Sequence, residues 1–229
     1  KGWIPYALKA AEKLLMEEKI SYLITTGPPH STHITGLNLK KKFEINWWVD
    51  FRDPWTDIFY NKHFYRTKKT IYKDKKLEME VIQNADGIIT TLAGRLYETL
   101  KLKAPNKKII TLPNGYDKDL IERVKASPEK ANFHIVYAGL LTHNQEYFNL
   151  LEVLNECSEF NKVKFSLAGN ISKKILHEIK KTLPKVEIDF LGYISHEKSI
   201  TLMKSADLLV NFIFKGAENQ MISGKLFEY

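Results

Sequence analysis

Short runs of β-branched and aromatic residues alternate with longer amphipathic stretches through the whole chain. This alternation is typical of βαβ units, in which a helix connects two parallel strands of one sheet. Eight runs are predicted to be strands: Tyr22–Thr25, Asn46–Asp50, Gly87–Thr90, Ile109–Leu112, Phe133–Ala138, Val163–Ala168, Val186–Leu191 and Leu208–Phe212. The sequence therefore predicts an α/β protein with two sets of four parallel strands.

The amphipathic stretches between these runs are the predicted helices. They are Ile4–Glu18, Thr32–Lys41, Lys68–Asn84, Arg95–Lys101, Tyr147–Glu159, Lys173–Leu183 and Ser195–Ser205. A polar segment at 116–132 contains Pro128 and precedes a new strand, so it predicts a boundary between two domains, at 1–125 and 126–229. Four strands are few for each sheet, and the chain stops within a predicted helix, so we expect sequence to be missing at both ends.

Composition excludes several other classes of protein. The 229 residues are 44% hydrophobic and 27% charged, which is typical of a globular chain and excludes general disorder. The single cysteine, Cys157, can form no intrachain disulfide, which fits a reducing compartment. No apolar run approaches the roughly 18 residues of a membrane-spanning helix. We therefore expect a cytoplasmic protein.

Positive charge is concentrated in the first half of the chain. Residues 1–120 carry 21 Lys and Arg against 14 Asp and Glu, and the segment Lys62–Lys76 has seven basic residues, one acid and three interleaved aromatics. Such a segment can meet phosphates of nucleic acid or of an anionic membrane. It can equally be a solvated helix face whose lysine stems cover apolar neighbours.

Four predicted strands end at a glycine, namely Gly27, Gly139, Gly169 and Gly192. Ligands of open parallel sheets bind at the carboxyl ends of the strands, so these turns predict the functional edge. The chain contains no GxG, GxxxxGK[ST], HExxH or GxSxG motif, which excludes the usual dinucleotide, P-loop, zinc protease and serine hydrolase sites. The HxxH pair of His30 and His33 lacks a third metal ligand and is expected to be structural or substrate-facing rather than metal-binding.

Several segments together resemble one family. They are the DFRDPW run within Trp48–Trp55, the PNG turn within Leu112–Asp117, the strand and turn Ile135–Gly139, the run Phe190–Ile194, and the GKLFEY run within Ser223–Tyr229. In this combination the chain resembles the retaining glycosyltransferases of GT-B fold, also called group 1 glycosyltransferases, and in particular a bacterial subgroup. The resemblance implies two Rossmann-like domains: an acceptor-side domain followed by a domain that binds a nucleotide sugar.

The resemblance also implies a set of donor-binding positions. A helix beginning near Gly224 presents free backbone N–H groups to a diphosphate, Lys225 adds positive charge, and Glu228 corresponds to the family's ribose-binding glutamate. The alternative for Lys225 and Glu228 is an ordinary charged helix surface, and for Tyr193 and Ile194 it is plain loop packing. The implied donor-binding residues are Gly139, His143, Asn144, Tyr193, Ile194, Gly224, Lys225 and Glu228.

In the first domain, the resemblance implies that the loops at Gly27–His30 and Asp50–Asp53 serve the acceptor and the sugar. Gly27 and Arg52 are the expected acceptor-side residues, and His30, Asp53 and Glu228 the expected catalytic ones. The alternatives are a hydrogen-bonded loop histidine at His30 and an internal ion pair between Arg52 and Asp53. The DxD of Asp117 and Asp119 is interpreted as a solvated linker.

The chain departs from the family pattern at two places. After Gly139 the family has an Arg and a Lys that clamp the diphosphate, whereas residues 140–146 offer only His143 and Asn144. The family's first paired glutamate would fall at position 220, which is Gln220. Loss of a cationic clamp weakens stabilisation of a departing diphosphate. Activity would therefore be reduced or lost unless other groups compensate.

The implied function is transfer of a sugar from a nucleotide diphosphate donor to a glycan or lipid-linked acceptor with retention of configuration, in bacterial polysaccharide biosynthesis. The family needs no metal or other cofactor. The expected partners are the donor, the acceptor and an anionic membrane surface at Lys62–Lys76, with no nucleic acid. Two alternatives stay open: a nucleotide-sugar epimerase of the same fold, and a non-catalytic nucleotide-binding domain.

Overall fold

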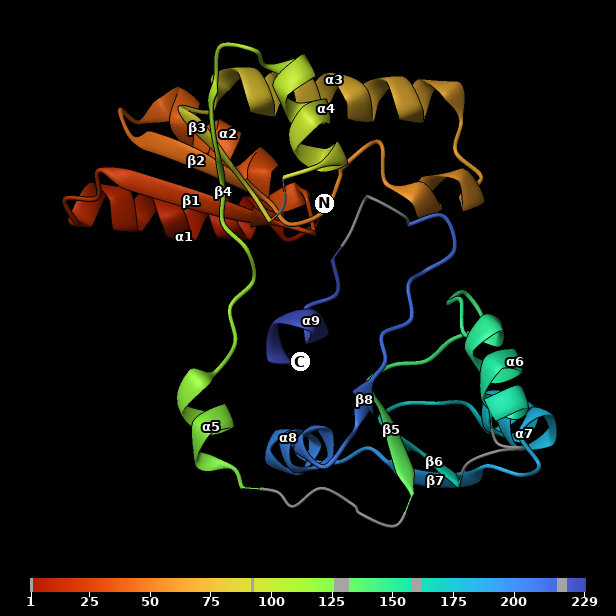
Figure 1. Cartoon of the computed structure of the whole chain (residues 1–229). Coiled ribbons are helices and arrows are strands. Elements are labelled where there is room, and N and C mark those ends of the chain that lie inside the picture. The colour runs from red at the N-terminus through yellow and green to blue at the C-terminus, as the bar shows by residue number, and fades with distance from the viewer. Residues whose placement is uncertain (1, 92, 126–131, 158–161, 218–221) are drawn as a thin grey trace. The chain divides into compact units, whose positions relative to one another are not determined.

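The computed structural model describes residues 2–91, 93–125, 132–157, 162–217 and 222–229. The chain divides into two compact units, the first comprising 1–114 and the second beginning at Gly115 and including Ser223–Tyr229 (Figure 1). The predicted limit at 125/126 lies eleven residues beyond this division. The helix α5 (Lys118–Arg123) therefore groups with the second unit.

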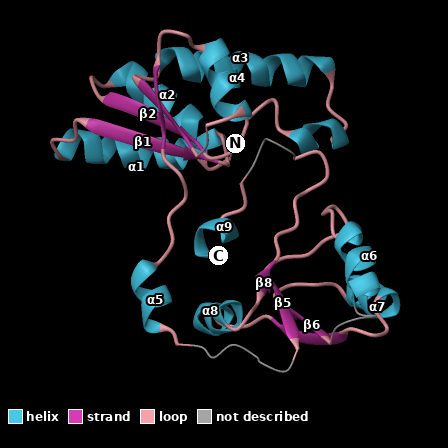
Figure 2. Ribbon diagram, viewed as in Figure 1, coloured by secondary structure: helices cyan, strands magenta, loops and turns pink. Residues whose placement is uncertain are grey.

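The first unit is built on a parallel sheet with the strand order β1-β2-β3-β4 (Figure 2). The strands are β1 (Tyr22–Gly27), β2 (Asn46–Phe51), β3 (Gly87–Thr90) and β4 (Lys108–Thr111). Thr25 pairs with Val49, and Val49 pairs with Ile88, so strands that follow one another in the sequence are also neighbours in the sheet. The four strands predicted for this half of the sequence are confirmed to within three residues at each end.

Helices cover one face of this sheet. They are α1 (Ile4–Glu17), α2 (Ser31–Lys42), α3 (Lys68–Asn84) and α4 (Arg95–Lys103), with a short 3-10 helix, η1 (Phe59–His63), that the sequence pattern did not predict. An apolar cluster lies between the sheet and the helices, and its buried members from β2, α3 and α4 are Trp47, Val49, Phe51, Val81, Ile82, Leu96 and Leu100. Burial of these residues holds the strands against the helices and so sets the positions of the carboxyl ends of the strands.

The second unit also has a parallel sheet, with the strand order β7-β6-β5-β8. Its strands are β5 (Phe133–Ala138), β6 (Val163–Ala168), β7 (Glu187–Gly192) and β8 (Leu208–Leu209). The strand predicted at Leu208–Phe212 is shorter than expected. Val210 N still donates to Val136 O at 3.0 Å, but beyond it the chain turns to the loop after β5, where Glu146 N donates to Ile213 O at 2.9 Å.

Both faces of this sheet are covered by helices. Ile135 and Tyr137 of β5 pack towards α6 (Phe148–Cys157) and α7 (Lys173–Thr182), while Val136 and Ala138 pack towards α5 and α8 (His196–Lys204). This alternation explains why β5 has no polar face. The helix predicted at Tyr147–Glu159 begins at Phe148, and its last two predicted residues lie outside the described residues.

The segment interpreted as a solvated linker contains α5. Asp117 caps this helix, since its Oδ1 accepts a hydrogen bond from Leu120 N at 2.9 Å. Leu120 and Ile121 then pack against the core beneath α8. The interpretation of Asp117 as linker is therefore corrected: its carboxylate is the N-cap of a short helix. Asp119 is exposed in the first turn of that helix.

The carboxyl edge of the second sheet is shaped by three glycines with positive φ, Gly139 at 143°, Gly169 at 119° and Gly192 at 64°. Gly139 N donates to Ala168 O at 2.8 Å, and Gly169 N donates to Gly192 O at 2.6 Å, so the three turns are hydrogen-bonded side by side. A Cβ on Gly169 would lie 2.1 Å from Gly139 O. Only glycine allows two backbones to approach this closely.

These elements confirm the predicted fold class, two Rossmann-like α/β units with parallel four-stranded sheets. Across the described ranges, no helix combines the length and the apolar character needed to cross a membrane.

Candidate functional site

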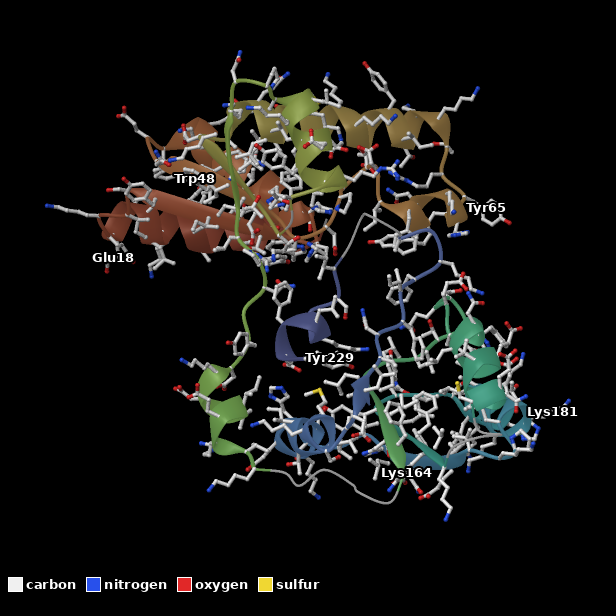
Figure 3. The ribbon with its side chains drawn as sticks, in the orientation of Figure 1. Glu18, Trp48, Tyr65, Lys164, Lys181 and Tyr229 are labelled. Atoms are coloured by element: carbon white, nitrogen blue, oxygen red, sulfur yellow. The ribbon has the colours of Figure 1, made fainter. Side chains whose placement is uncertain are left out.

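A pocket of about 300 Å³ lies at the carboxyl edge of the second sheet. Its walls come from the ends of β5 and β6, the segment between β7 and α8, helix α8 itself, and the C-terminal helix α9 (Lys225–Glu228). Figure 3 shows Tyr229 at the end of this last helix. The lining residues are Ala138, Gly139, Ala168, Gly169, Tyr193, Ile194, His196, Ser199, Met203, Lys225, Glu228 and Tyr229.

Lys225 enters this pocket across the Gly139 turn. Its Nζ donates a hydrogen bond to the Tyr137 hydroxyl at 2.8 Å and lies 4.1 Å from the centre of the Tyr137 ring. The Tyr137 hydroxyl in turn donates to Leu140 O at 2.5 Å. A Cβ on Gly139 would lie 2.3 Å from Lys225 Cε. The absence of a side chain at Gly139 therefore makes room for the lysine.

The charge of Lys225 lacks a carboxylate partner. Burial lowers the pKa of its ammonium group from the ordinary value to about 8. No carboxylate of the described residues lies within ion-pair distance of its Nζ, whose hydrogen bond is to the Tyr137 hydroxyl. Since buried cations in proteins are normally paired, this arrangement favours an anionic ligand in the pocket.

Glu228 supplies a carboxylate to the same pocket. Its Oε1 lies 3.0 Å from Nε2 of His196, a residue of α8. Beside it, the Tyr229 hydroxyl donates to Val210 O at 3.2 Å and ties the end of α9 to the sheet. Burial and the nearby Glu228 carboxylate raise the pKa of the Tyr229 hydroxyl. The pocket therefore combines one unpaired cation with one oriented carboxylate.

Five of the predicted donor-binding residues line this pocket: Gly139, Tyr193, Ile194, Lys225 and Glu228. Gly224 does not line it; it is the exposed N-cap position of α9, which has only four residues. Sequence reasoning missed Tyr137 and His196 as partners of Lys225 and Glu228. They lie 88 and 32 positions away from these partners, so no local spacing could have indicated them.

The structure places His143 and Asn144 away from the pocket lining. His143 Nδ1 lies 3.4 Å from the Tyr147 hydroxyl, which donates to Glu178 at 2.9 Å. The carbonyl of Asn144 accepts from Lys215 N at 2.8 Å. These contacts hold the loop after β5 against α6, α7 and the chain beyond β8, so neither side chain lines the pocket with Lys225.

In the first unit, His30 and His33 lie at the carboxyl edge of the sheet. The His30 ring stacks on Trp55 with ring centres 5.1 Å apart and planes 9° apart, and it lies 5.6 Å from the buried His33 ring. A Cβ on Gly27 would lie 2.8 Å from His30 Nδ1 and 2.7 Å from His33 Nε2. Gly27 therefore lets the two rings close over the end of β1.

Hydrogen bonds connect His33 to the sheet. Trp47 Nε1 donates to Thr25 Oγ1 at 3.0 Å, and the Thr25 hydroxyl shares a second hydrogen bond of 2.9 Å with His33 Nδ1. His33 Nε2 and His30 Nδ1 are buried and have no hydrogen-bond partner among the described residues. Burial lowers the pKa of His30 to about 4 and that of His33 to about 3, the latter helped by His30.

Arg52 ties the strand ends of the first unit together. Its Nη1 lies 3.6 Å from Asp50 Oδ1 and donates to Leu112 O at 3.4 Å, and its Nη2 donates to Asn114. Its backbone N donates to Gly27 O at 3.0 Å. The expected ion pair with Asp53 is therefore corrected, because the ion pair of Arg52 is with Asp50.

Asp53 is a half-buried carboxyl group. Burial raises its pKa, although the neighbouring Arg52 acts in the opposite direction. The loop that follows is fixed by an acidic residue of α3, because Thr56 Oγ1 donates to Glu78 at 2.5 Å and Lys103 of α4 lies 2.9 Å from the same carboxylate. Asp53 therefore lies in a loop that is held in place by these contacts with Glu78. No trio of His, Cys, Asp or Glu within the described ranges is arranged to hold a metal ion.

Part of the second unit matches the sequence model of a known family. Residues 117–211 match the sequence model of the family described as "Glycosyl transferases group 1". The matched range runs from the cap of α5 to just beyond β8 and includes Gly139, Tyr193, Ile194 and His196 of the pocket. A search of curated protein sequences found no significant match.

Solved structures share the fold at low sequence identity. A glycosyltransferase from Rickettsia africae superposes with a TM-score of 0.64 at 12% identity over 90% of this chain and 55% of that chain. A sucrose-phosphate synthase from Thermosynechococcus elongatus gives a TM-score of 0.59 at 12% identity, covering 90% and 53%. A TarM mutant from S. aureus, in complex with fondaparinux, alpha-GlcNAc-glycerol and UDP, gives 0.52 at 16%, covering 81% and 36%.

These likenesses establish the fold as that of GT-B proteins. The chain spans between about a third and just over half the length of these three proteins. The family match covers residues 117–211, which is less than half of the chain, and the likenesses to solved structures show the fold.

Acidification is expected to destabilise the first unit through its two buried histidines. Their folded pKa values of about 4 and about 3 lie below the unfolded value of about 6.5, so the unfolded state binds more protons between these limits. The free energy of unfolding should therefore fall as pH decreases from 6.5 to 4, by up to about 1.4 kcal/mol per pH unit for each histidine. Urea denaturation followed by tryptophan fluorescence measures this unit, because all four tryptophans lie in it.

In the variant His33→Gln, the slope of the free energy of unfolding against pH should decrease by the contribution of one histidine, up to about 1.4 kcal/mol per pH unit. The exposed His63 provides the control, and His63→Gln should keep the wild-type slope. Equal slopes in His33→Gln and wild type would contradict the assignment.

Proposed function

We propose that this protein transfers a sugar from a nucleoside diphosphate sugar to an acceptor hydroxyl, and that the pocket of the second unit binds the nucleoside diphosphate. The observation that carries the proposal is Lys225, a half-buried cation with no carboxylate partner in the part of the chain that the structure describes, in the same pocket as the oriented Glu228. The family match over residues 117–211 supports the reaction class.

The chemistry of such a transfer suits this arrangement. The bond between the anomeric carbon and the diphosphate oxygen breaks, and its electron pair leaves with the diphosphate. The acceptor oxygen bonds to the anomeric carbon, and its proton passes to the departing diphosphate oxygen. A cation at the leaving group stabilises the developing negative charge, which is the role we assign to Lys225. We assign Glu228 to the ribose hydroxyls, and Tyr193 and Ile194 to the base.

Lys225 also bears on the missing basic clamp. The loop after Gly139 carries no Arg or Lys up to position 146, yet Lys225 approaches the same turn from α9, with its Cε 2.3 Å from where a Gly139 Cβ would lie. One cation is therefore available at the turn from a different element. This favours an active transferase over the non-catalytic alternative.

The first unit is proposed to bind the acceptor and the sugar. His30 has a buried ring nitrogen, Nδ1, without a hydrogen-bond partner among the described residues, Asp53 is a half-buried carboxyl, and Gly27 and Arg52 shape the loops around them. Retention of configuration, the absence of a metal requirement, a cytoplasmic location and a role in bacterial polysaccharide synthesis belong to this proposal through the family resemblance. UDP is the first nucleotide to test, because the TarM complex contains it.

Turnover distinguishes the proposal from its alternatives. The protein is incubated with UDP-N-acetylglucosamine, UDP-glucose or GDP-mannose, with and without glycan and lipid-linked hydroxyl acceptors, and nucleotide release and sugar transfer are measured. Acceptor-dependent release supports the transferase. Conversion of the donor sugar without an acceptor would indicate an epimerase. Nucleotide binding without either reaction would indicate a non-catalytic domain.

Lys225 predicts a specific pH dependence of nucleotide binding. If its ammonium group binds the diphosphate, UDP affinity should be constant below pH 8 and fall above it by up to tenfold per pH unit, because the free pKa is about 8. Calorimetric titration measures this. Lys225→Ala should weaken UDP binding by about tenfold to a hundredfold, and Lys225→Arg should keep binding but lose the pH dependence.

The matched control is Lys174→Ala, which removes an exposed lysine of α7 that is outside the pocket. This variant should bind UDP as the wild type does. Equal UDP affinity in Lys225→Ala and wild type would rule out the assigned role.

The proposal includes a membrane contact at the segment Lys62–Lys76. All six of its lysines are exposed, and none has a carboxylate within ion-pair distance among the described residues, because Asp74 pairs with Arg66. Tyr65 is fully exposed and projects from the chain between η1 and α3 (Figure 3), and Phe64 is 58% exposed. Unpaired lysines with exposed aromatic rings fit an anionic lipid surface.

Neutralising Lys68, Lys69, Lys73 and Lys75 with glutamine should abolish binding to phosphatidylglycerol-containing vesicles. Each lysine contributes about 1 kcal/mol at such a surface, so the loss should exceed a hundredfold. Vesicle co-sedimentation measures it. The control replaces Lys173, Lys174, Lys180 and Lys181 of α7, which are also exposed and give the same change of net charge. Equal loss in both variants would indicate unspecific charge attraction and contradict this surface.

A further inference from the structure

The Glu228 carboxylate is held by a single side chain, His196. The Nε2 of His196 lies 3.0 Å from Oε1 of Glu228, and both residues line the pocket of the second unit. No other side chain or backbone group of the described residues hydrogen-bonds to this carboxylate. Oε2 and one lone pair of Oε1 are therefore left for a ligand.

The two partners differ in how firmly the chain places them. His196 is the first residue of α8, which Ser195 caps and which buries Ile200 and Met203 in the core. Glu228 is the last residue of α9, a helix of only four residues. The side chain of His196 is 51% exposed and that of Glu228 is 28% exposed. The contact therefore connects a carboxylate on a short helix to a helix anchored in the core.

Such a contact has a consequence for binding. A glutamate side chain that is free to rotate must be ordered when a ligand binds, which costs about three- to tenfold in affinity. A partner that holds the carboxylate beforehand removes this cost. The benefit applies only to ligand groups that the carboxylate itself contacts, so it can be separated from a general effect on the pocket.

We propose that His196 is a positioning residue that orients Glu228 towards the ribose hydroxyls of the bound nucleoside diphosphate and so sets the preference for ribose over 2′-deoxyribose. This inference rests on the proposed function. It extends that function to a residue that the family resemblance did not indicate. His196 itself does not contact the reacting atoms in this role.

The test is a comparison of UDP with 2′-deoxy-UDP by calorimetric titration of the wild type and four variants. Wild type should prefer UDP, and Glu228→Ala should bind both nucleotides equally. His196→Ala should lower the affinity for UDP by about three- to tenfold while leaving 2′-deoxy-UDP within twofold. His196→Gln, whose amide can donate to Glu228, should restore part of the preference. The control His177→Ala removes an exposed histidine of α7.

Equal weakening of both nucleotides in His196→Ala would overturn the inference, because it would indicate a structural effect on the whole pocket. A second readout needs no nucleotide: in NMR spectra of the histidine rings recorded at one pH, Glu228→Gln should shift the ring nitrogen signal of His196 and leave that of His177 unchanged. An unchanged His196 would also overturn the inference. A third outcome concerns the proposed function. If wild type binds no UDP but Glu228→Gln still changes the His196 ring signal, the proposed function is refuted and the contact between His196 and Glu228 is established.

Discussion

The second unit depends on the close approach of two backbones at Gly169. A side chain there would collide with the carbonyl of Gly139, and without one the turns after β5, β6 and β7 hydrogen-bond in a row. This row leaves the carboxyl edge of the sheet free of side chains at Gly139 and Gly169. Lys225 then fills the space beside Gly139, where its ammonium group contacts Tyr137. The shape of the pocket thus follows from glycine positions that the sequence already contains.

Electrostatics adds a second constraint to this shape. Burial disfavours the charge on Lys225, and among the described residues its Nζ contacts the ring and hydroxyl of Tyr137 and has no carboxylate within ion-pair distance. An anionic ligand would stabilise the charged form of Lys225, since a buried cation is stabilised by an opposite charge. In the first unit the corresponding edge is different: two uncharged histidines pack on Trp55 and Phe51, and Arg52 is engaged with the strand ends. The two edges therefore differ in charge, because the second unit has the lysine Lys225 at its pocket and the first unit has two uncharged histidine rings at its edge.

Sequence patterns predicted the parts of the structure that depend on local chemistry. Strand alternation and glycine turns placed the edge of each sheet, and the GKLFEY run brought Lys225 and Glu228 into the pocket. The contacts of distant residues escaped prediction: His196 meets Glu228 only because α8 packs beside α9, and Arg52 donates to Leu112 and Asn114 because the ends of β2 and β4 lie at the same edge of the sheet. The sequence predicted His143 as a donor-binding residue, but His143 does not line the pocket. Its ring lies near the Tyr147 hydroxyl, which donates to Glu178 of α7.

The central claim is that a nucleoside diphosphate binds at the glycine edge of the second unit. The most direct measurement is a map of backbone amide chemical shifts by NMR as UDP is added to isotopically labelled protein. Binding at this edge should shift the amides of Gly139, Gly169 and Gly192 together and leave those around His143 nearly unchanged. Shifts that are absent from the three glycines, or that cluster around His30 and Trp55 instead, would contradict the claim.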